Sequence, residues 1–223
     1  MATDRKLHRA NSDGPEVWAP IHAWRTLAQL RAAEATVPLL NLLHQYEEDD
    51  WVQEEIPVVM GMIGQPAIAP LQEYLANHRR RLYPRIGAAQ SLSEVAQRHT
   101  QHRSECVQAL TDQLRKFEQN NRTFSAFLIS YLVDLDADEA AEVMEAAFAA
   151  DKVDFSIRGD WEDAQIELGL IPQRTTPPMD NLWDEIPPAQ PGLSHAARKK
   201  NREKAKYKKN SAKNSRKKNK RKR

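Results

Sequence analysis

Two stretches decide the fold of this chain, "ATVPLLNLL" at residues 35–43 and "AIAPLQEYL" at residues 67–75. They carry Ala, Pro, Leu and Leu at identical offsets, and the second copy begins 32 residues after the first. Two looser copies fill the same Leu slots farther along the chain, with Leu110 and Leu114, then with Met144 and Phe148. Repeats of this length are typical of stacked helical hairpins, in which each pair buries its apolar face against the next.

The spacing of the apolar residues supports helices throughout the region around these copies. From residue 19 to residue 170 apolar side chains recur at helical intervals, and few stretches alternate as strands do. We therefore predict an all-α domain of about four helical hairpins followed by a terminal helix around Trp161. The side chains expected in its core are Leu71, Leu75, Leu128, Leu132 and Met144.

Helix ends are also marked in the sequence. Asp50, Asp136 and Asp160 each stand three residues before a side chain that suits a capping box, so each is predicted to begin a helix. Gly64 and Gly169 follow apolar runs and suit the residue after a helix. We expect helices of about 10 to 18 residues with short turns between them.

A resemblance adds to this prediction. The segment "EEIPVVMGMIGQPAIAPLQEYL" at residues 54–75 resembles a HEAT repeat, particularly the short type found in phycobilisome lyases. The segment at residues 127–170 is similar to a family of bacterial HEAT-like proteins classed as a domain of unknown function. The first resemblance implies a HEAT-like α-solenoid, and the second implies no known activity.

Charge divides the chain into parts. The whole sequence has 33 Lys and Arg and 31 Asp and Glu, but residues 196–223 hold sixteen of the basic residues and one acidic residue. The other residues are left with 17 basic and 30 acidic side chains, a net of −13 against +15 in the tail. We predict an N-terminal arm at 1–18, a solenoid at 19–170, a Pro-rich linker at 171–195 and a disordered basic tail at 196–223.

The tail is predicted to bind nucleic acid without sequence preference, because its cations can neutralise phosphates and release counterions. RNA or the ribosome is the expected partner, while the body of net −13 should repel phosphate. Folding back on the acidic body, solubilisation and a nuclear targeting role for "KKNKRKR" stay open as alternatives. The predicted contact residues are Arg198, Lys199, Lys200, Arg202, Lys204, Lys206, Lys208, Lys209, Lys213, Arg216, Lys217, Lys218, Lys220, Arg221, Lys222 and Arg223.

Within the linker, an apolar trio stands among acidic residues in "MDNLWDEIPP". Leu182, Trp183 and Ile186 have no local core, and isolated aromatic residues commonly anchor a segment in a groove. We predict that the trio anchors the linker on a partner protein or on this protein's own solenoid. Chance exposure is the alternative.

Patterns that could carry chemistry have better structural explanations. Asp134, Asp136, Asp138 and Glu145 have calcium-loop spacing, but the sixth position lacks the required Gly. His99 and His102 lack partners at zinc spacing, and Cys106 heads an apolar stripe typical of a core residue. We therefore expect no catalytic residue, no metal and no cofactor.

One basic cluster interrupts the acidic body. It contains His78, Arg79, Arg80, Arg81 and Arg85. Cations gathered at the C-terminal end of a helix, where the helix dipole favours them, are the preferred explanation. A docking site for acidic protein or phosphate is the alternative.

The expected function follows from these parts. We predict a non-enzymatic scaffold that binds another protein on its solenoid and is tethered through its tail. The alternative is an enzyme or enzyme subunit resembling the HEAT-like phycobilin lyases, which a co-purifying pigment would reveal. One cysteine, no secretory signal and no apolar run of membrane-spanning length predict a cytoplasmic protein, whose oligomeric state the sequence leaves open.

Overall fold

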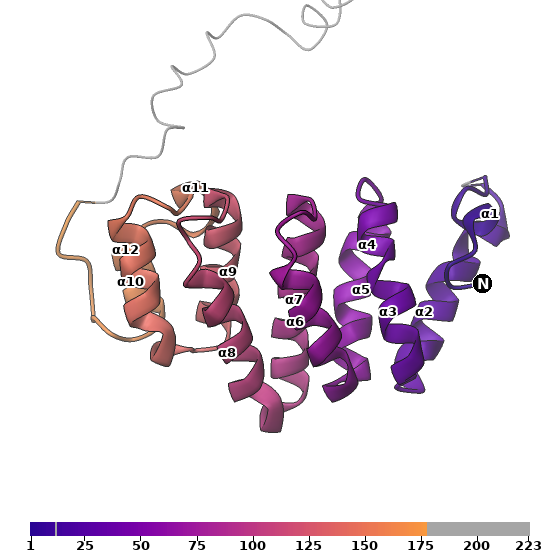
Figure 1. The fold of residues 1–223 in the computed structure, drawn as a ribbon, viewed down its shortest axis with the longest axis horizontal. Coiled ribbons are helices and arrows are strands. Elements are labelled where there is room, and N and C mark those ends of the chain that lie inside the picture. Colours follow the sequence, from indigo (N-terminus) through magenta and orange to yellow (C-terminus); the bar gives the residue numbers. More distant parts are fainter. Residues whose placement is uncertain (12, 178–223) are drawn as a thin grey trace, which may run out of the picture. The chain divides into compact units, whose positions relative to one another are not determined.

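The computed structural model describes residues 1–11 and 13–177, and every regular element within them is helical (Figure 1). The α-helices are α1 (Arg5–His8), α2 (Ala19–Gln29), α3 (Thr36–Leu40), α4 (Leu42–Gln45), α5 (Asp50–Ile63), α6 (Ile68–Ala76), α7 (Leu82–Arg98), α8 (Arg103–Leu114), α9 (Arg122–Asp134), α10 (Ala141–Ala149), α11 (Phe155–Arg158) and α12 (Trp161–Glu167). Short 3₁₀ turns are η1 (Pro15–Trp18), η2 (Ala33–Ala35), η3 (Gln65–Ala67), η4 (Thr100–His102) and η5 (Asp138–Ala140).

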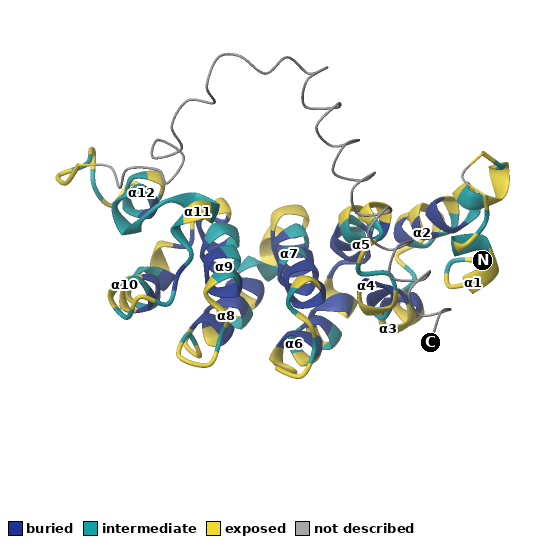
Figure 2. Ribbon diagram, turned by 90° about the horizontal axis from the view of Figure 1, so that it is seen from above, coloured by how far each residue is buried: buried dark blue, intermediate teal, exposed yellow. Residues whose placement is uncertain are grey.

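One local pattern occurs four times along the described chain. A first helix is followed by a turn, a 3₁₀ turn and a second helix, as α2–η2–α3, α5–η3–α6, α7–η4–α8 and α9–η5–α10. Figure 2 shows the first helices α2, α5, α7 and α9 in one row and α3, α6, α8 and α10 in another. The all-α class is confirmed for the described residues, and α12 begins at Trp161, where a terminal helix was predicted. Several helices are shorter than the expected 10 to 18 residues.

The core lies where the two rows meet. Leu71, Leu128, Leu132 and Met144 have no exposed surface, and Leu75 is 2% exposed, which confirms the predicted set. Of these five, Leu71, Leu75 and Met144 occupy repeated apolar slots, while Leu128 and Leu132 lie on the first helix α9. Phe148, the last repeated slot, is only partly buried.

Proline fits this arrangement at the start of the second helices. Pro38 is the third residue of α3 and Pro70 the third residue of α6. An N–H group at this position would have no partner within the helix, so its absence costs little. Both prolines therefore stand in the first turn of their helices.

The predicted helix ends are partly correct. Asp160 and Asp163 form the expected capping box of α12, and Gly64 has a φ of 83° directly after α5. The cap of α5 is Asp49, not Asp50, because the Asp49 side chain accepts from the backbone N–H of Val52.

A second predicted cap is wrong. Asp136 lies in the turn after α9 with a φ of 50°, and η5 begins after Ala137 without a side-chain cap. The backbone oxygen of Asp136 accepts from Arg103 at 2.8 Å instead. An arginine on α8 thus stabilises this turn, in which an aspartate was expected to begin the helix.

The N-terminal segment packs on the first hairpin. Trp24, which is 1% exposed on α2, donates its Nε1–H to the backbone oxygen of Ala2 at 2.8 Å. The His8 ring stacks on Tyr46, with 4.3 Å between ring centroids. Residues Ala2 and His8 of this segment therefore pack against the end of the core at α2.

Some predictions lie outside the described residues. These are the anchor formed by Leu182, Trp183 and Ile186, and the sixteen basic residues of the tail from Arg198 to Arg223. Of the helices within residues 1–11 and 13–177, none combines the length and the apolar character that crossing a bilayer requires.

Candidate functional site

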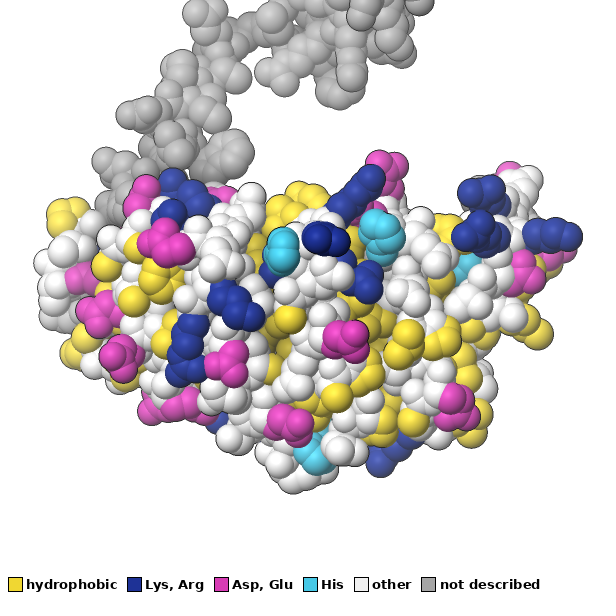
Figure 3. Space-filling view, in the orientation of Figure 1, with side chains coloured by type: hydrophobic (Ala, Val, Ile, Leu, Met, Phe, Trp, Pro, Cys, Tyr) yellow, Lys and Arg dark blue, Asp and Glu magenta, His cyan; other side chains and the backbone are white. Residues whose placement is uncertain are grey.

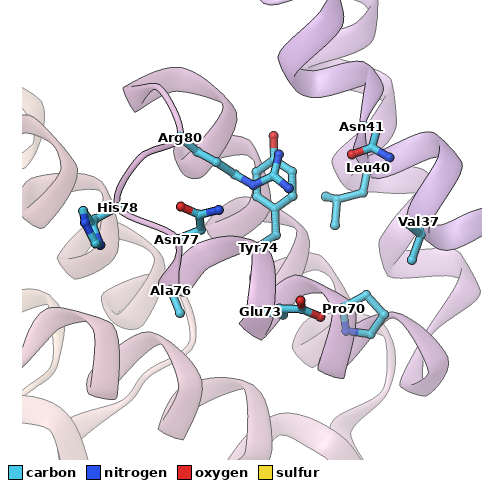
Figure 4. Close-up of a pocket in the computed structure, with 10 residues that line it drawn as sticks. All are labelled: Val37, Leu40, Asn41, Pro70, Glu73, Tyr74, Ala76, Asn77, His78 and Arg80. Atoms are coloured by element: carbon cyan, nitrogen blue, oxygen red, sulfur yellow. The ribbon is translucent and has the colours of Figure 1, made fainter.

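A pocket of about 490 Å³ lies between the second helices of the first two hairpins (Figure 4). One wall comes from α3 and the residue after it, and the other from α6 and the connection to α7. The lining residues are Val37, Leu40, Asn41, Pro70, Glu73, Tyr74, Ala76, Asn77, His78 and Arg80. We call this the α3–α6 groove.

Two polar side-chain atoms of the groove are buried without a hydrogen-bond partner in the described chain. Tyr74 is 3% exposed, and its Oη has no partner among the described residues. The Nε of Arg80 is likewise buried and unpartnered within that part of the chain. An unpaired buried donor costs about 1 to 3 kcal/mol, so two in one pocket require an explanation.

The two side chains lie against each other. The Arg80 guanidinium carbon is 3.7 Å from the centroid of the Tyr74 ring, a cation–π contact. Figure 4 shows Arg80 reaching over the ring, with Leu40 and Asn41 of the α3 side facing the pair across the pocket. Burial raises the pKa of the Tyr74 phenol, so its Oη keeps its proton and can donate at neutral pH.

The local sequence explains this position of Arg80. Helix α6 ends at Ala76, and the Asn77 side chain accepts from the backbone N–H of Arg79 at 3.1 Å. This local turn leads the chain back towards α7, and the backbone N–H of Arg80 donates to the Asn77 carbonyl at 3.1 Å. Arg80 is thereby held beside the C-terminal end of α6.

The structure divides the basic cluster predicted from the sequence. Arg85 is 7% exposed and donates to the backbone oxygen of Leu75 at 3.2 Å, so it serves the end of α6, as the helix-end interpretation expects. Arg81 pairs with Glu47 at 2.8 Å. His78 and Arg80 line the groove.

The groove offers mainly hydrogen-bond donors to a ligand. The side chains of Asn41, Asn77, Tyr74 and Arg80 can all donate, and Glu73 places a carboxylate at the rim. On the face shown in Figure 3, basic and His side chains gather along the upper edge of the body. This combination suits carbonyl or carboxylate oxygens with a nearby N–H group, which an extended peptide segment provides.

The other candidate residues of the sequence lie apart from this groove. His99 Nε2 is 3.0 Å from the backbone oxygen of Gly61, while the His102 ring is 3.8 Å from the Glu105 carboxylate. The two rings therefore have different partners. Burial raises the pKa of the Cys106 thiol to about 12, so this side chain is an inert part of the core.

The acidic residues with calcium-loop spacing are also used separately. Asp134 pairs with Arg158 at 2.6 Å, and Glu145 lies within α10, away from the turn that holds Asp136. Within residues 1–11 and 13–177, no group of three or more His, Cys, Asp or Glu side chains is placed to hold a metal ion.

Sequence reasoning missed the groove itself. It found His78 and Arg80 as cations, but it did not single out Tyr74 or Asn41, because the pocket exists only where two hairpins meet. Val37, which lines the groove, is apolar yet 55% exposed, and only the structure reveals that exposure.

Comparison with known proteins identifies one family. Residues 13–170 match the model described as "Protein of unknown function (DUF1186)". Searches of the curated proteins and of the solved structures return no match. The family match agrees with the expected likeness to a domain of unknown function, and it adds no support for the HEAT-repeat or phycobilisome-lyase resemblance.

Proposed function

Since this chain belongs to the DUF1186 family, whose description states no activity, we propose from its own surface that it is a non-enzymatic protein-interaction scaffold. In this proposal the α3–α6 groove binds an extended segment of a partner protein. The basic tail tethers the assembly to RNA without sequence preference.

One observation carries the proposal. Tyr74 Oη and Arg80 Nε are buried donors without partners in the described chain, and both residues line an open pocket of about 490 Å³. Pockets of roughly 300 to 1,000 Å³ hold drug-sized ligands, which is also the size of a short stretch of peptide. Both atoms have almost no exposed surface in the free chain, so a bound peptide carbonyl or carboxylate would satisfy them, and recover the cost of burying them, once the two side chains turn toward the groove.

A repeat architecture supports a role in binding. We propose that the four hairpins form a short HEAT-like α-solenoid, because each second helix is preceded by a 3₁₀ turn and the Pro and Leu slots recur. Solenoids present extended surfaces built from equivalent helices, and such surfaces commonly hold peptides. The α3–α6 groove lies between two of these equivalent helices.

The tail proposal rests on the sequence alone. Sixteen Lys and Arg with one acidic residue in 28 positions can contact several phosphates at once. Affinity should then fall steeply with salt, with a log–log slope of about 0.9 per duplex phosphate contacted or about 0.7 for single strands. Tyr207 is the one aromatic residue of the tail, so base stacking should add little.

A pair of matched variants tests the groove. The probe is a synthetic peptide of the partner segment that cross-linking to the full chain identifies. We expect Arg80→Gln to weaken binding of this peptide by about tenfold, because a charge-assisted hydrogen bond is lost. Arg79→Gln removes the same charge from an exposed neighbour outside the groove and should leave binding unchanged. Equal loss in both variants would show that only the net charge of this edge matters.

A salt titration tests the tail. The full chain should bind two RNAs of unrelated sequence with similar affinity and a similar dependence on salt. Replacing Lys217, Lys218, Lys220, Arg221 and Lys222 with Gln should reduce the slope, because fewer cations remain to neutralise phosphates. An orders-of-magnitude preference for one RNA, or an unchanged slope, would contradict the tether.

A further inference from the structure

A second, smaller pocket lies at the N-terminal end of the body. It has a volume of about 160 Å³. Its walls come from α1, η1, α2 and the start of α5. The lining residues are His8, Val17, Trp18, Pro20, Ile21, Trp24, Asp49 and Trp51. We call this the tryptophan pocket.

Two of its tryptophans are exposed to an extent that the fold does not require. Trp18 is 44% and Trp51 48% exposed, and their rings meet edge to face with 5.6 Å between centroids. Trp24, by contrast, is 1% exposed and serves the core. Large aromatic surface left beside a pocket is typical of a binding site, because burying it on a ligand is favourable.

The charge of the pocket is negative. Asp49 is the acidic residue of the lining, and the neighbouring Glu48 and Asp50 extend the same charge along the chain, while Glu47 is paired with Arg81. Asp49 Oδ1 accepts from the backbone N–H of Val52 at 3.3 Å, and no hydrogen bond of the described chain uses its Oδ2. The N-terminus of α5 contributes about half a positive charge, which the full charge of Asp49 outweighs.

We propose that the tryptophan pocket binds the ammonium end of a lysine side chain from a partner protein. A cation beside this edge-to-face pair can contact the face of one tryptophan ring, which attracts it through the ring quadrupole, and the Asp49 carboxylate of the same lining supplies the opposite charge. At about 160 Å³ the pocket holds one side-chain end but falls short of the roughly 300 Å³ of a typical small-molecule site. This site prefers a cation, whereas the α3–α6 groove prefers acceptor oxygens, so the two proposals stand independently.

The probe for the test is lysine blocked as its N-acetyl methylamide, titrated into the full chain while the indole N–H resonances are followed by NMR. We expect the Trp18 and Trp51 resonances to shift together. The Trp24 resonance should shift less, because its N–H donates a hydrogen bond to the backbone oxygen of Ala2. The norleucine analogue has the same carbon chain without the charge. It should bind at least about fivefold more weakly, since a partly desolvated cation–π contact is lost.

Asp49→Asn is the decisive variant, because asparagine caps a helix as well as aspartate does and the fold is therefore retained. It should weaken lysine binding by about three- to tenfold through loss of the charge. The matched variant Asp50→Asn removes an equal charge one residue away, outside the pocket lining, and should change binding by less than about twofold. Norleucine binding as tightly as lysine, or equal effects of the two variants, would overturn the proposal. Stronger binding of a blocked arginine than of lysine would also overturn the choice of lysine.

Discussion

Arginine is used differently in the middle of the body and at its C-terminal end. In the middle, Arg85 is 7% exposed, lies with its guanidinium carbon 4.1 Å from the centroid of the Phe124 ring, and donates to the Leu75 carbonyl. At the end, Arg174 contacts Asp160 at 2.6 Å and Asp163 at 2.5 Å. Burial lowers the pKa of Arg85, whereas hydrogen bonds to two carboxylates raise the pKa of Arg174.

The difference shows how each part of the described chain is held together. Around Arg85 the main contribution is packing, because a planar cation fills space against an aromatic ring and satisfies one carbonyl. Around Arg174 the contribution is electrostatic, because an exposed segment is tied to the capping box of α12. The stability of the middle should therefore fall when a substitution removes buried volume. The local order of the C-terminal end should instead depend on side-chain charge and on pH.

The largest expected effect comes from emptying the middle. Leu71→Ala removes a side chain with no exposed surface from a repeated slot of α6. We expect the free energy of unfolding to fall by about 2 to 5 kcal/mol, as transfer and cavity costs add. Chemical denaturation measures it, with Val37→Ala, which truncates a 55% exposed side chain, as the control. A loss below about 1 kcal/mol would mean that this part of the core is not tightly packed.

The next effect tests the buried arginine. Arg85→Ala leaves the Leu75 carbonyl without its donor and removes the contact with Phe124, so unfolding should become easier by about 2 to 3 kcal/mol. Arg79→Ala, at an exposed position of the same cluster, should change stability by less than about 0.5 kcal/mol. Equal effects in denaturant titrations would show that Arg85 contributes no more than a surface charge.

Sequence patterns were informative where one segment determines its own structure. The apolar spacing predicted helices and the core at Leu71 and Met144, because burial follows the 3.6-residue period of a helix. The capping box of α12 was predicted correctly because its two members, Asp160 and Asp163, are three residues apart in the sequence. The cap of α5 was missed by one residue, since Asp49 and Asp50 are chemically equivalent in sequence.

Contacts between hairpins escaped sequence reasoning. Arg85 was grouped with its basic neighbours, although its aromatic partner lies on α9 and its acceptor on α6. Asp136 was expected to cap a helix, but the backbone in its turn is held by Arg103 from α8. The α3–α6 groove has the same origin, because its walls belong to two copies of the repeat.

A smaller effect concerns that groove. Tyr74→Phe removes a buried hydroxyl that has no partner in the described chain. The free protein should become more stable by about 0.5 to 1 kcal/mol, while binding of the proposed partner segment weakens, because the hydroxyl serves the ligand and not the fold. Tyr83→Phe, at a position 59% exposed, is the control for thermal denaturation. A clear loss of stability in Tyr74→Phe would mean that the hydroxyl has a structural partner.

The smallest global effect is expected at the C-terminal end, where charge should act locally. The segment at residues 171–177 is tied to α12 through Arg174 and through Thr175 and Thr176, whose hydroxyl and backbone groups donate to Glu162. These bonds hold the pKa of Glu162 down to about 2, and Arg174 lowers the pKa of Asp160. A carboxylate with a depressed pKa stabilises the ordered state fully at a pH above its ordinary pKa. This contribution is lost as the pH falls towards the depressed pKa.

The tie should therefore be complete at neutral pH and weaken between about pH 4.5, near the ordinary value for Glu, and about pH 2. The amide resonances of Thr175 and Thr176, followed by NMR during an acid titration, should move over this range towards the values of an unstructured peptide. Arg174→Gln should produce part of the same change at pH 7 while lowering the melting temperature by less than about 3 °C, because a partly exposed ion network contributes little to global stability. Arg115→Gln, which breaks the exposed pair with Asp112, should leave both amides unchanged. Two outcomes would contradict this contrast between Arg85 and Arg174: amide resonances that stay unchanged as the pH is lowered to about 2, or unfolding of the whole body by Arg174→Gln. Either would mean that residues 171–177 are held by packing, as the middle is.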